Sequence, residues 1–557
     1  MEDWKKYWKK KKDIFKNRCI EEQKKVQKEI DSPFETQIKV LFQILDMNKN
    51  TEFGRMYHFG QINCISDFKK NVPISDYEQY REWIDKEIDK RGGVLSSSKI
   101  LRYLKTSGTT GKNKAIPFTQ FWMEQTRTPA LYALWGYYLK YYPELLDNPY
   151  SVLDLSTVRE PVKDELNGIP YQSISNRNVI YNDKDWDPCW YEAPWFDESV
   201  PIDYDEKMYY RIRYFIGQDL KAIVSINPST LVALYQNIIK NKERLIQDIK
   251  TGTLCEKKIS EPDEQSAKHL EEIMKSGHFT MNDLWPELRM LSCWTASSTE
   301  LYLPKLHELY PKAKILPYMA CGSEGIVAIP VSKDLKAAPL AVGHGYYEFV
   351  PEDVDYEEIK KHPENTLSFR QLEEGKNYHL IMSQANGIMR YMPGDIYKVT
   401  GFIGEVPKIE FVTRANTFFS FTGEKLTEEQ ILEAIEKTYE KLKIKSGLFF
   451  FTPVWGVQPY YELILEVSDS YLKSSEELEL IFDQGLRKAS YEFDSKRESN
   501  RIGKTKICCI PYGMIDQFIE KQKKKGNGTQ FKYKPFVKEH SMLEQLLSKI
   551  EERRVVS

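Results

Sequence analysis

Short apolar runs alternate with longer helical patterns along most of the chain, and this alternation restricts the fold more than any other feature. The runs span four or five residues and are bounded by turn residues, at 152–155, 222–226, 314–318 and 378–382. A helical pattern over 231–249 separates two of them. Because strands that alternate with helices are typical of sheets covered by helices, the sequence predicts an α/β fold and disfavours an all-helical one.

A change of pattern near residue 415 predicts a second, smaller unit. Residues 427–430 match a capping box at the start of a helix, and strand-like and helical patterns follow them. The order strand, helix, strand, strand, helix is typical of a small α+β domain. We therefore expect a large N-terminal body over residues 1–415 and a mobile C-terminal domain over residues 416–557.

The charges of the chain nearly cancel and exclude two broad classes of protein. The 557 residues include 80 Lys and Arg and 82 Asp and Glu, for a net charge of -2. This balance argues against a protein that coats nucleic acid and against an acidic disordered chain. The 8 cysteines are scattered without a C-x-x-C pair, so a zinc ribbon or a disulfide scaffold is not expected. With no apolar run long enough for a membrane span and no targeting segment, we expect a cytoplasmic protein.

Residues 106–114 contain the sharpest local signal for a ligand. Four hydroxyls, two glycines and two lysines lie within these nine positions. Glycines let backbone N–H groups approach a phosphate, hydroxyls donate hydrogen bonds, and lysine balances charge. A Walker loop is excluded, because four residues must separate its glycines and only two separate Gly108 from Gly111. Taken alone, the stretch could also be an ordinary polar hairpin.

Two further turns carry a carboxylate after an apolar run. One is 317–325, which contains Glu324, and the other is 387–395, which ends at Asp395. Open α/β sheets bind ligands at the carboxyl ends of their strands, where a carboxylate could hold Mg²⁺ or the hydroxyls of a ribose. Taken alone, each turn is more simply explained as solvated.

In this order the three stretches resemble the signature motifs of the adenylate-forming enzymes, and specifically the auxin-responsive Gretchen Hagen family of acyl-acid amido synthetases. The three motifs of the family that this chain resembles are Ser-Ser-Gly-Thr-Ser/Thr-x-Gly, Tyr-x-x-Ser-Glu and Tyr-Arg-Tyr-Arg-x-Gly-Asp, in this order. Flanking stretches at 53–55, 226–229, 346–351 and 530–532 are also similar, and the resemblance covers roughly residues 45 to 540. The combination is specific although each piece is not.

The resemblance implies an ATP-dependent ligase with small-molecule substrates. It would adenylate a carboxylic acid, release pyrophosphate, and pass the acyl group to an amino acid or other amine. The implied cofactors are ATP and Mg²⁺, with ATP and the acid bound by the body at 1–415. A monomer is expected, with no nucleic-acid partner. Two alternatives stay open: transfer of the acyl group to a thiol such as coenzyme A, and a catalytically silent binding protein on the same fold.

The resemblance also assigns residues. The implied nucleotide-binding residues are Ser107, Gly108, Thr109, Thr110, Gly111, Ser323, Asp395 and Arg414. Glu324 would act in catalysis by binding Mg²⁺ or the α-phosphate, and Asp395 would bind the ribose hydroxyls. Lys425 or Lys532 would reach the phosphates from the mobile domain.

The sequence departs from the family's motifs at three places. Ala320 stands where the family has a tyrosine, so the aromatic side chain there is expected from Tyr318. Met392 replaces the second arginine of the third motif. Near the end, Lys534 competes with Lys532 for the position of the family's lysine. These departures concern the choice of substrate more than the nucleotide chemistry.

Overall fold

The chain divides into two compact units. The computed structural model describes residues 2–106, 114–196, 201, 203–275, 277–296, 302–414, 418–419, 426–445, 447–455, 458–471, 475–498, 502–525, 533–537, 540–543, 546 and 548. The first unit comprises Met1–Pro201, Glu206–Ala296 and Leu309–Val412. The second comprises Ile202–Asp205, Ser297–Glu308 and Thr413–Ser557. Among the residues described, no helix combines the length and apolarity needed to cross a membrane.

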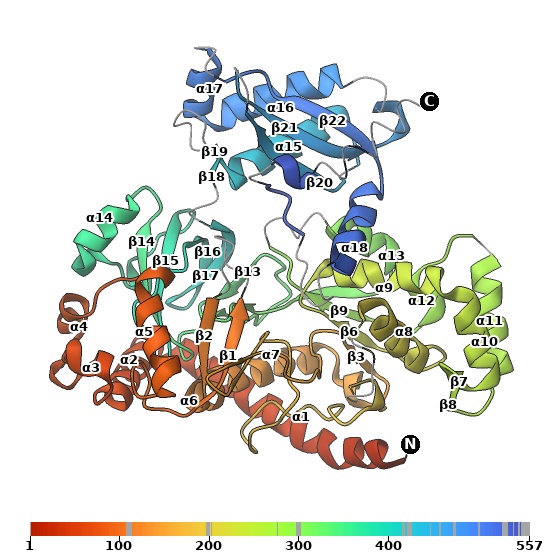
Figure 1. The fold of residues 1–557 in the computed structure, drawn as a ribbon, viewed down its shortest axis with the longest axis horizontal. Helices are drawn as coiled ribbons and strands as arrows, with labels where there is room; N and C mark the ends of the chain where they lie inside the picture. The colour runs from red at the N-terminus through yellow and green to blue at the C-terminus, as the bar shows by residue number, and fades with distance from the viewer. Residues whose placement is uncertain are drawn as a thin grey trace. The chain divides into compact units, whose positions relative to one another are not determined.

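A parallel sheet of four strands lies in the first unit (Figure 1). Its strands, in spatial order, are β10 (Lys314–Pro317), β9 (Met290–Cys293), β6 (Ala222–Val224) and β3 (Val152–Asp154). All of their residues except Lys314 are buried, as expected for a parallel sheet that needs cover on both faces. Three of the apolar runs in the sequence therefore form strands, and the predicted α/β fold is confirmed.

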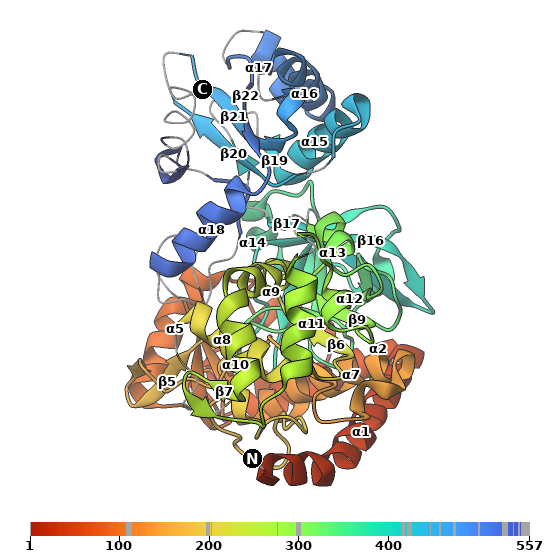
Figure 2. The same cartoon turned by 90° about the vertical axis from the view of Figure 1, so that its right-hand side faces the viewer.

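The helical pattern after β6 forms two helices, α9 (Pro228–Lys240) and α10 (Lys242–Thr251). They are followed by α11 (Glu264–Lys275) and α12 (Met281–Leu284), and preceded by α8 (Tyr204–Phe215). Figure 2 shows α8, α10 and α11 grouped on one side of the first unit. A two-stranded hairpin, β7 (Thr253–Leu254) and β8 (Lys257–Lys258), joins α10 to α11.

Two further sheets carry the other stretches of interest. A five-stranded sheet has the order β13 (Ala337–Pro339), β17 (Val406–Arg414), β16 (Asp395–Ile403), β15 (Asn377–Ser383) and β14 (Tyr346–Pro351). A four-stranded sheet has the order β2 (Lys114–Thr119), β1 (Ile100–Thr106), β5 (Ile169–Gln172) and β4 (Glu165–Leu166). The fourth apolar run of the sequence lies in β15. Most of the first motif falls between β1 and β2, outside the described residues.

Helices at the N-terminus complete the first unit. Helix α1 (Glu2–Asp31) buries Trp4, Trp8 and Phe15 and packs against α7 (Thr128–Tyr141). Further helices of the unit are α2 (Pro33–Asn48), α3 (Glu52–Met56), α4 (Ile65–Asn71), α5 (Tyr77–Lys90), α6 (Gln120–Trp122) and α14 (Tyr356–Lys361). The aromatic side chains of α7 therefore serve mainly as core, because Tyr132 and Trp135 both contact the ring of Phe15.

The second unit has its own sheet and core. Strands β20 (Phe449–Val454), β21 (Tyr460–Val467) and β22 (Lys506–Pro511) form the sheet. Helices α15 (Glu428–Leu442) and α16 (Glu476–Ala489) pack together, and their apolar side chains share a core with β20 and β21. The predicted capping box at 427–430 is confirmed, because the Thr427 hydroxyl accepts a hydrogen bond from the Gln430 N–H. Smaller elements are β18 (Phe418–Phe419), β19 (Leu426–Thr427), α13 (Leu303–Leu309), α17 (Tyr491–Glu498) and α18 (Met514–Lys525).

Candidate active site

The turn of the second motif lies just beyond the carboxyl end of the parallel sheet. Strand β10 ends at Pro317, and the short hairpin β11 (Ala320–Cys321) and β12 (Ile326–Ala328) follows. The Gly322 N–H donates to the Gly325 carbonyl at 2.9 Å, which closes the turn that carries Ser323 and Glu324. Both side chains are half-buried. The structure therefore places this carboxylate at the edge where open α/β sheets bind ligands.

The third motif ends at the start of β16, with Asp395 half-buried. Side chains two residues apart on a strand lie on the same face, so Asp395 shares a face with Tyr397. The ring of Tyr397 lies 5.6 Å from that of Phe411, and Phe411 lies 6.1 Å from Trp294, which directly follows β9. Asp395 is thus on the side of β16 that is turned toward the carboxyl end of the parallel sheet.

A narrow pocket lies beside Trp294, which directly follows β9 at the carboxyl end of the parallel sheet. Its lining includes Trp294, Thr295, Tyr318, Ala320 and Phe411. The small Ala320 and the neighbouring Tyr318 both contribute, so the aromatic side chain expected from Tyr318 is present at this pocket. Its free volume is about 20 Å³, little more than one water molecule needs.

The loop at 384–387 contacts the second motif and the residues that follow the first motif, and it leads into the third; the sequence analysis did not identify it. The Asn386 side-chain amide donates to the Glu324 carbonyl at 3.2 Å. The Trp122 indole N–H donates to the Gln384 amide oxygen at 3.3 Å, and the Thr119 hydroxyl donates to the Ala385 carbonyl at 3.4 Å. Thr119 ends β2 and Trp122 follows it, so they lie just after the first motif. The only local signal for this loop was the Asn-Gly pair at its end.

Glycine is needed where this loop approaches its neighbours. A Cβ atom at Gly325 would lie 2.5 Å from the Cδ of Gln384, and one at Gly345 would lie 2.2 Å from its Nε2. Gln384 is fully buried. The second motif can therefore pack against the loop only because Gly325 has no side chain.

A buried ion pair supports the third motif. Arg390 and Glu348 have side chains that are 0% and 2% exposed, and their two hydrogen bonds are both 2.9 Å long. The remaining Arg390 N–H groups donate mainly to backbone carbonyls, those of Lys69, Val72 and Pro363. The guanidinium therefore joins three segments of the body around the loop that leads to Asp395.

The Met392 departure has a simple structural explanation. Its side chain is 2% exposed and belongs to an apolar cluster with Ile74, Val350, Ile359 and Ile381. A second arginine at this position would bring an unpaired charge into that cluster. This chain accordingly has core packing where the family motif has a cation.

Arg127 is a further residue that the sequence analysis missed. It ends a π-helical segment, Met123–Arg127, which follows α6, and it is 6% exposed. Its Nη1 donates to the Cys321 sulfur at 3.4 Å, and its charge also acts on Tyr318. Burial lowers the pKa of Arg127, but interactions with Cys321 and Tyr318 more than offset this and raise it overall. A buried cation thus lies directly against the second motif.

Several predicted site residues lie outside the described residues, and for them the assignments stay predictions. They are Ser107, Gly108, Thr109, Thr110, Gly111, Lys425 and Lys532. The backbone of Arg414 ends β17, and its side chain is also outside the described part. Of the predicted site residues that the structure describes, Ser323 and Glu324 lie in a turn that the loop at 384–387 contacts, and Asp395 starts β16 eight residues after that loop.

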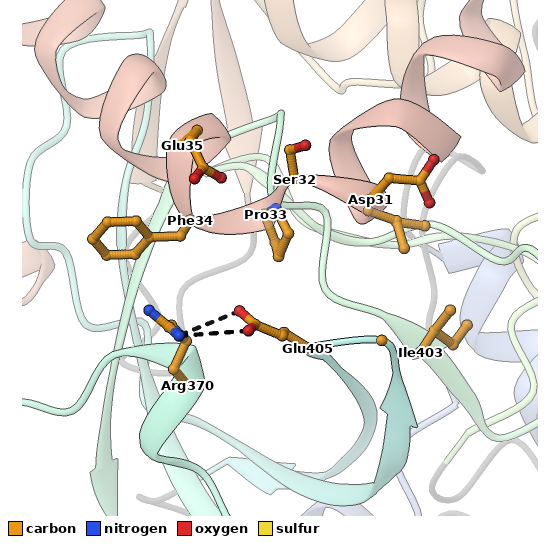
Figure 3. Close-up of a pocket in the computed structure, with 10 residues that line it drawn as sticks. Asp31, Ser32, Pro33, Phe34, Glu35, Arg370, Ile403 and Glu405 are labelled. Carbon is orange, nitrogen blue, oxygen red and sulfur yellow. Dashed lines mark hydrogen bonds and ion pairs between the residues drawn. The ribbon is translucent and has the colours of Figure 1, made fainter.

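Two larger cavities lie elsewhere. One of about 590 Å³ lies where α1 meets α2, and is lined by Asp31, Phe34, Arg370 and Glu405 among others (Figure 3). Arg370 and Glu405 form an ion pair along one side of it, and both side chains are about half exposed. Another cavity of similar volume lies beside α11 and α12. Neither contains a predicted site residue, so cavity size does not locate the chemistry here.

Comparison with known families gives three consecutive matches. They are the GH3 family N-terminal domain at residues 22–315, its central domain at 338–414 and its C-terminal domain at 429–541. The chain belongs to the GH3 family. The family predicted from the three motifs is therefore confirmed.

Relatives and solved structures agree with this assignment. The indole-3-acetic acid-amido synthetase GH3.17 of Arabidopsis thaliana is 24% identical over 575 residues, which cover 92% of each protein. The indole-3-acetic acid-amido synthetase GH3.2 of the same plant is 24% identical over 73% of this chain and 78% of its own. These names agree with the predicted enzyme class, a ligase of the amido synthetase kind.

The fold is shared with two solved structures. One is the AtGH3.15 acyl acid amido synthetase in complex with 2,4-DB, with a TM-score of 0.78, 18% identity and 95% coverage of both chains. The other is 2-hydroxyisobutyryl-CoA ligase in the postadenylation state, with a TM-score of 0.51, 11% identity and coverage of 93% and 91%. The predicted adenylate-forming type of fold is confirmed.

Proposed function

We propose that this chain activates a carboxylic acid with ATP and transfers the acyl group from the acyl adenylate to an amino acid or other amine. The observation that carries the proposal is the meeting of the second and third motifs around the loop at 384–387. The Asn386 side chain links them by its hydrogen bond to the Glu324 carbonyl. Membership of the GH3 family and the names of its amido synthetases support the choice of an amide-forming reaction.

The nucleotide would bind between the two carboxylates. We assign Asp395 to the ribose hydroxyls, because its motif resembles the third motif of the adenylate-forming enzymes. Glu324 would hold Mg²⁺ or approach the α-phosphate. Among the residues described, no three His, Cys, Asp or Glu side chains gather as a metal site. This fits Mg²⁺ held by one carboxylate together with substrate phosphates, which is its usual mode in such enzymes.

The remaining assignments follow the motif resemblance. Ser107, Thr109 and Thr110, with Gly108 and Gly111, would bind the triphosphate, and Ser323 would support the nucleotide. Arg414 would lie at a hinge between a body of residues 1–415 and a C-terminal domain of residues 416–557. Lys425 or Lys532 would reach the phosphates from that domain.

Two half-reactions at one site explain why a mobile domain would help. Adenylation places the carboxylate of the acid against the α-phosphorus, from which pyrophosphate leaves, whereas aminolysis places an amine against the acyl carbonyl, from which AMP leaves. One rigid arrangement serves both poorly, so a domain that reorients between them would relieve the conflict. In both steps the protein's work is to orient the reactants and offset charge. We place the reaction in the cytoplasm, where scattered thiols stay reduced, and in a monomer, since one chain carries all three motifs.

The first test is acid-dependent exchange of pyrophosphate into ATP. Purified protein with Mg²⁺, ATP and a panel of acids that includes indole-3-acetate and benzoate should show exchange with at least one acid. Asp395→Ala should weaken ATP binding by about 1–3 kcal/mol, the range for a hydrogen bond to a charged group. Exchange with no acid would favour a silent binding protein, and unchanged ATP affinity in Asp395→Ala would remove the ribose assignment.

Transfer to a thiol is a second candidate, because the fold is shared with a coenzyme A ligase. Mass spectrometry distinguishes the two. With an acid that supports exchange, we expect an amide with at least one of the twenty amino acids and no thioester with coenzyme A. The opposite product pattern would establish the thiol reaction.

A further inference from the structure

Among the described residues, Arg127 has no carboxylate partner, although it is almost completely buried. Two other buried arginines of the same unit have a carboxylate partner, Arg177 with Asp185 and Arg390 with Glu348. Buried Arg102 also has no carboxylate partner among the described residues, but it donates to the Asn176 backbone carbonyl. Arg127 has instead the Cys321 sulfur at 3.4 Å and the side chain of Tyr318. An arginine cannot lose its proton to escape this situation. Among the residues that the structure describes, its charge is therefore left without a counter-ion.

Such an arrangement is costly and needs a reason. Moving an unpaired charge out of water costs several kcal/mol, and neither a sulfur atom nor a tyrosine hydroxyl offsets this desolvation free energy as a carboxylate does. A segment that carries the cost commonly serves a function, and single π-helical turns inside helices are frequent at functional sites. Arg127 ends such a segment. The energetics thus indicate an anion that arrives with a ligand.

Position narrows the choice of ligand. Arg127 contacts Cys321 and Tyr318, which flank Ala320 just before the Ser323–Glu324 turn. The segment that bears it begins at Met123, four residues after the end of β2. The buried rings of Phe118 and Trp122 pack against each other next to this segment. A phosphate chain gains nothing from an apolar surrounding, whereas an organic acid has an apolar body as well as a charged end.

We propose that Arg127 binds the carboxylate of the acyl-acid substrate, an inference that rests on the proposed function. The planar guanidinium fork matches the two oxygens of a carboxylate, which it can hold by two parallel hydrogen bonds. This contact orients the acid beside the Glu324 turn. It also offsets the repulsion between the carboxylate and the phosphates of ATP.

The kinetic test uses Arg127→Gln and Arg127→Lys in the full-length protein. With the panel acid that exchanges fastest, Arg127→Gln should raise KM for the acid at least tenfold, about the effect of losing a charge-assisted hydrogen bond. KM for ATP should stay within about threefold, because this contact is to the acid and not to the nucleotide. Arg127→Lys keeps the charge but not the fork, so it should fall between the wild type and Arg127→Gln.

Cys321→Ala is the matched control. It removes the sulfur that Arg127 contacts and leaves the guanidinium in place. Because no contact between the protein and the acid is lost, KM for the acid should change less than threefold. If Cys321→Ala reproduces the effect of Arg127→Gln, Arg127 serves only to hold the turn, and the inference fails. A rise in KM for ATP alone would assign Arg127 to a phosphate and overturn it equally.

A binding measurement distinguishes failure of this inference from failure of the proposed function. Calorimetric titration of the same acid and of its primary amide, without ATP, needs no turnover. The wild type should bind the acid more tightly than the amide, and Arg127→Gln, or Arg127→Lys if the first variant does not fold, should reduce that preference. An unchanged preference overturns the role of Arg127 even if exchange proceeds. Absence of exchange with a preserved preference would instead contradict only the proposed reaction.

Discussion

Two buried arginines of the first unit have opposite surroundings. Arg390 is enclosed by a carboxylate and three backbone carbonyls, so its guanidinium is saturated by the protein. Arg127 is buried almost as deeply but contacts only a thiol and a tyrosine among the described residues. Burial alone therefore does not show what a charged residue does. The saturated arginine is part of the scaffold, and the arginine without a carboxylate partner is the one that we propose binds the substrate.

The largest expected effect comes from breaking the saturated pair. Arg390→Ala leaves the Glu348 carboxylate buried without a cation, and removal of one partner of such a pair costs about 3–5 kcal/mol. We expect a loss of that size in the free energy of unfolding of the first unit, measured by urea denaturation. The loop toward Asp395 should loosen as well, so ATP binding should weaken in the same variant.

The paired replacement is the control for this prediction. Arg390→Met with Glu348→Leu removes both charges and fills the space with apolar groups. Such double replacements are often neutral, so most of the lost stability should return. A loss below about 1 kcal/mol in Arg390→Ala would show that the pair contributes no more than a surface ion pair.

Glu29 shows a third way to bury a charge, by taking up a proton. Burial raises its pKa to about 7, and its Oε2 lies 3.8 Å from the Nδ1 of His344. His344 offers no cation in return, because burial lowers its own pKa to about 3. In the unfolded chain the Glu29 carboxyl group ionises near pH 4.5. Between pH 4.5 and 7 the unfolded chain therefore loses this proton while the folded protein keeps it, so the free energy of unfolding falls as pH rises over that window.

Glu29→Gln removes this ionisation. The difference in unfolding free energy between Glu29→Gln and the wild type should be smallest below pH 4.5 and grow in favour of the variant up to pH 7. At most it should reach about 3 kcal/mol, from 1.36 kcal/mol per pKa unit. His344 is present in both proteins and largely cancels in the difference. A difference that stays flat from pH 4 to pH 8 would contradict the raised pKa.

Local patterns in the sequence predicted the elements well, for a physical reason. Strand alternation and the capping box at Thr427 depend on neighbours a few residues apart, and both appear in the structure. The hydrogen bonds of Arg390 to backbone carbonyls could not be predicted in this way, because one of the accepting residues, Lys69, is 321 residues away. Arg127 escaped for the same reason, since its partner Cys321 is 194 residues distant. The motifs located the two carboxylates, but only tertiary contacts show what surrounds them.

The loop that joins the motifs can be tested with two glycines. Gly387 has φ +95°, and a Cβ atom there would lie 2.6 Å from the Leu95 carbonyl oxygen. Gly375 has φ +84° with nothing within 4 Å of such an atom. Alanine at either position is strained by the left-handed backbone conformation. Only at Gly387 would its Cβ atom also collide with the backbone of a neighbouring segment.

We expect Gly387→Ala to cost about 2 kcal/mol more than Gly375→Ala in unfolding free energy. Its acid-dependent exchange should also fall, because the loop contacts Glu324 through Asn386. Equal losses in the two variants would mean that backbone conformation alone matters and that the loop has room to move. The comparison needs only denaturation curves and one exchange assay per variant.

The smallest expected effect is at Arg127, where the direction matters more than the size. Because its charge has no counter-ion among the described residues, Arg127→Met removes a desolvation cost together with weak contacts to Cys321 and Tyr318. Unfolding free energy in the absence of substrates should therefore change by less than about 1 kcal/mol or rise. Arg177→Met is the matched control, since its partner Asp185 has a fully buried side chain, and it should lose about 3–5 kcal/mol. If both variants lose the same amount, Arg127 is as much a part of the scaffold as Arg390. A stable Arg127→Met protein that no longer responds to the acid would separate the scaffold arginines from the one kept for substrate.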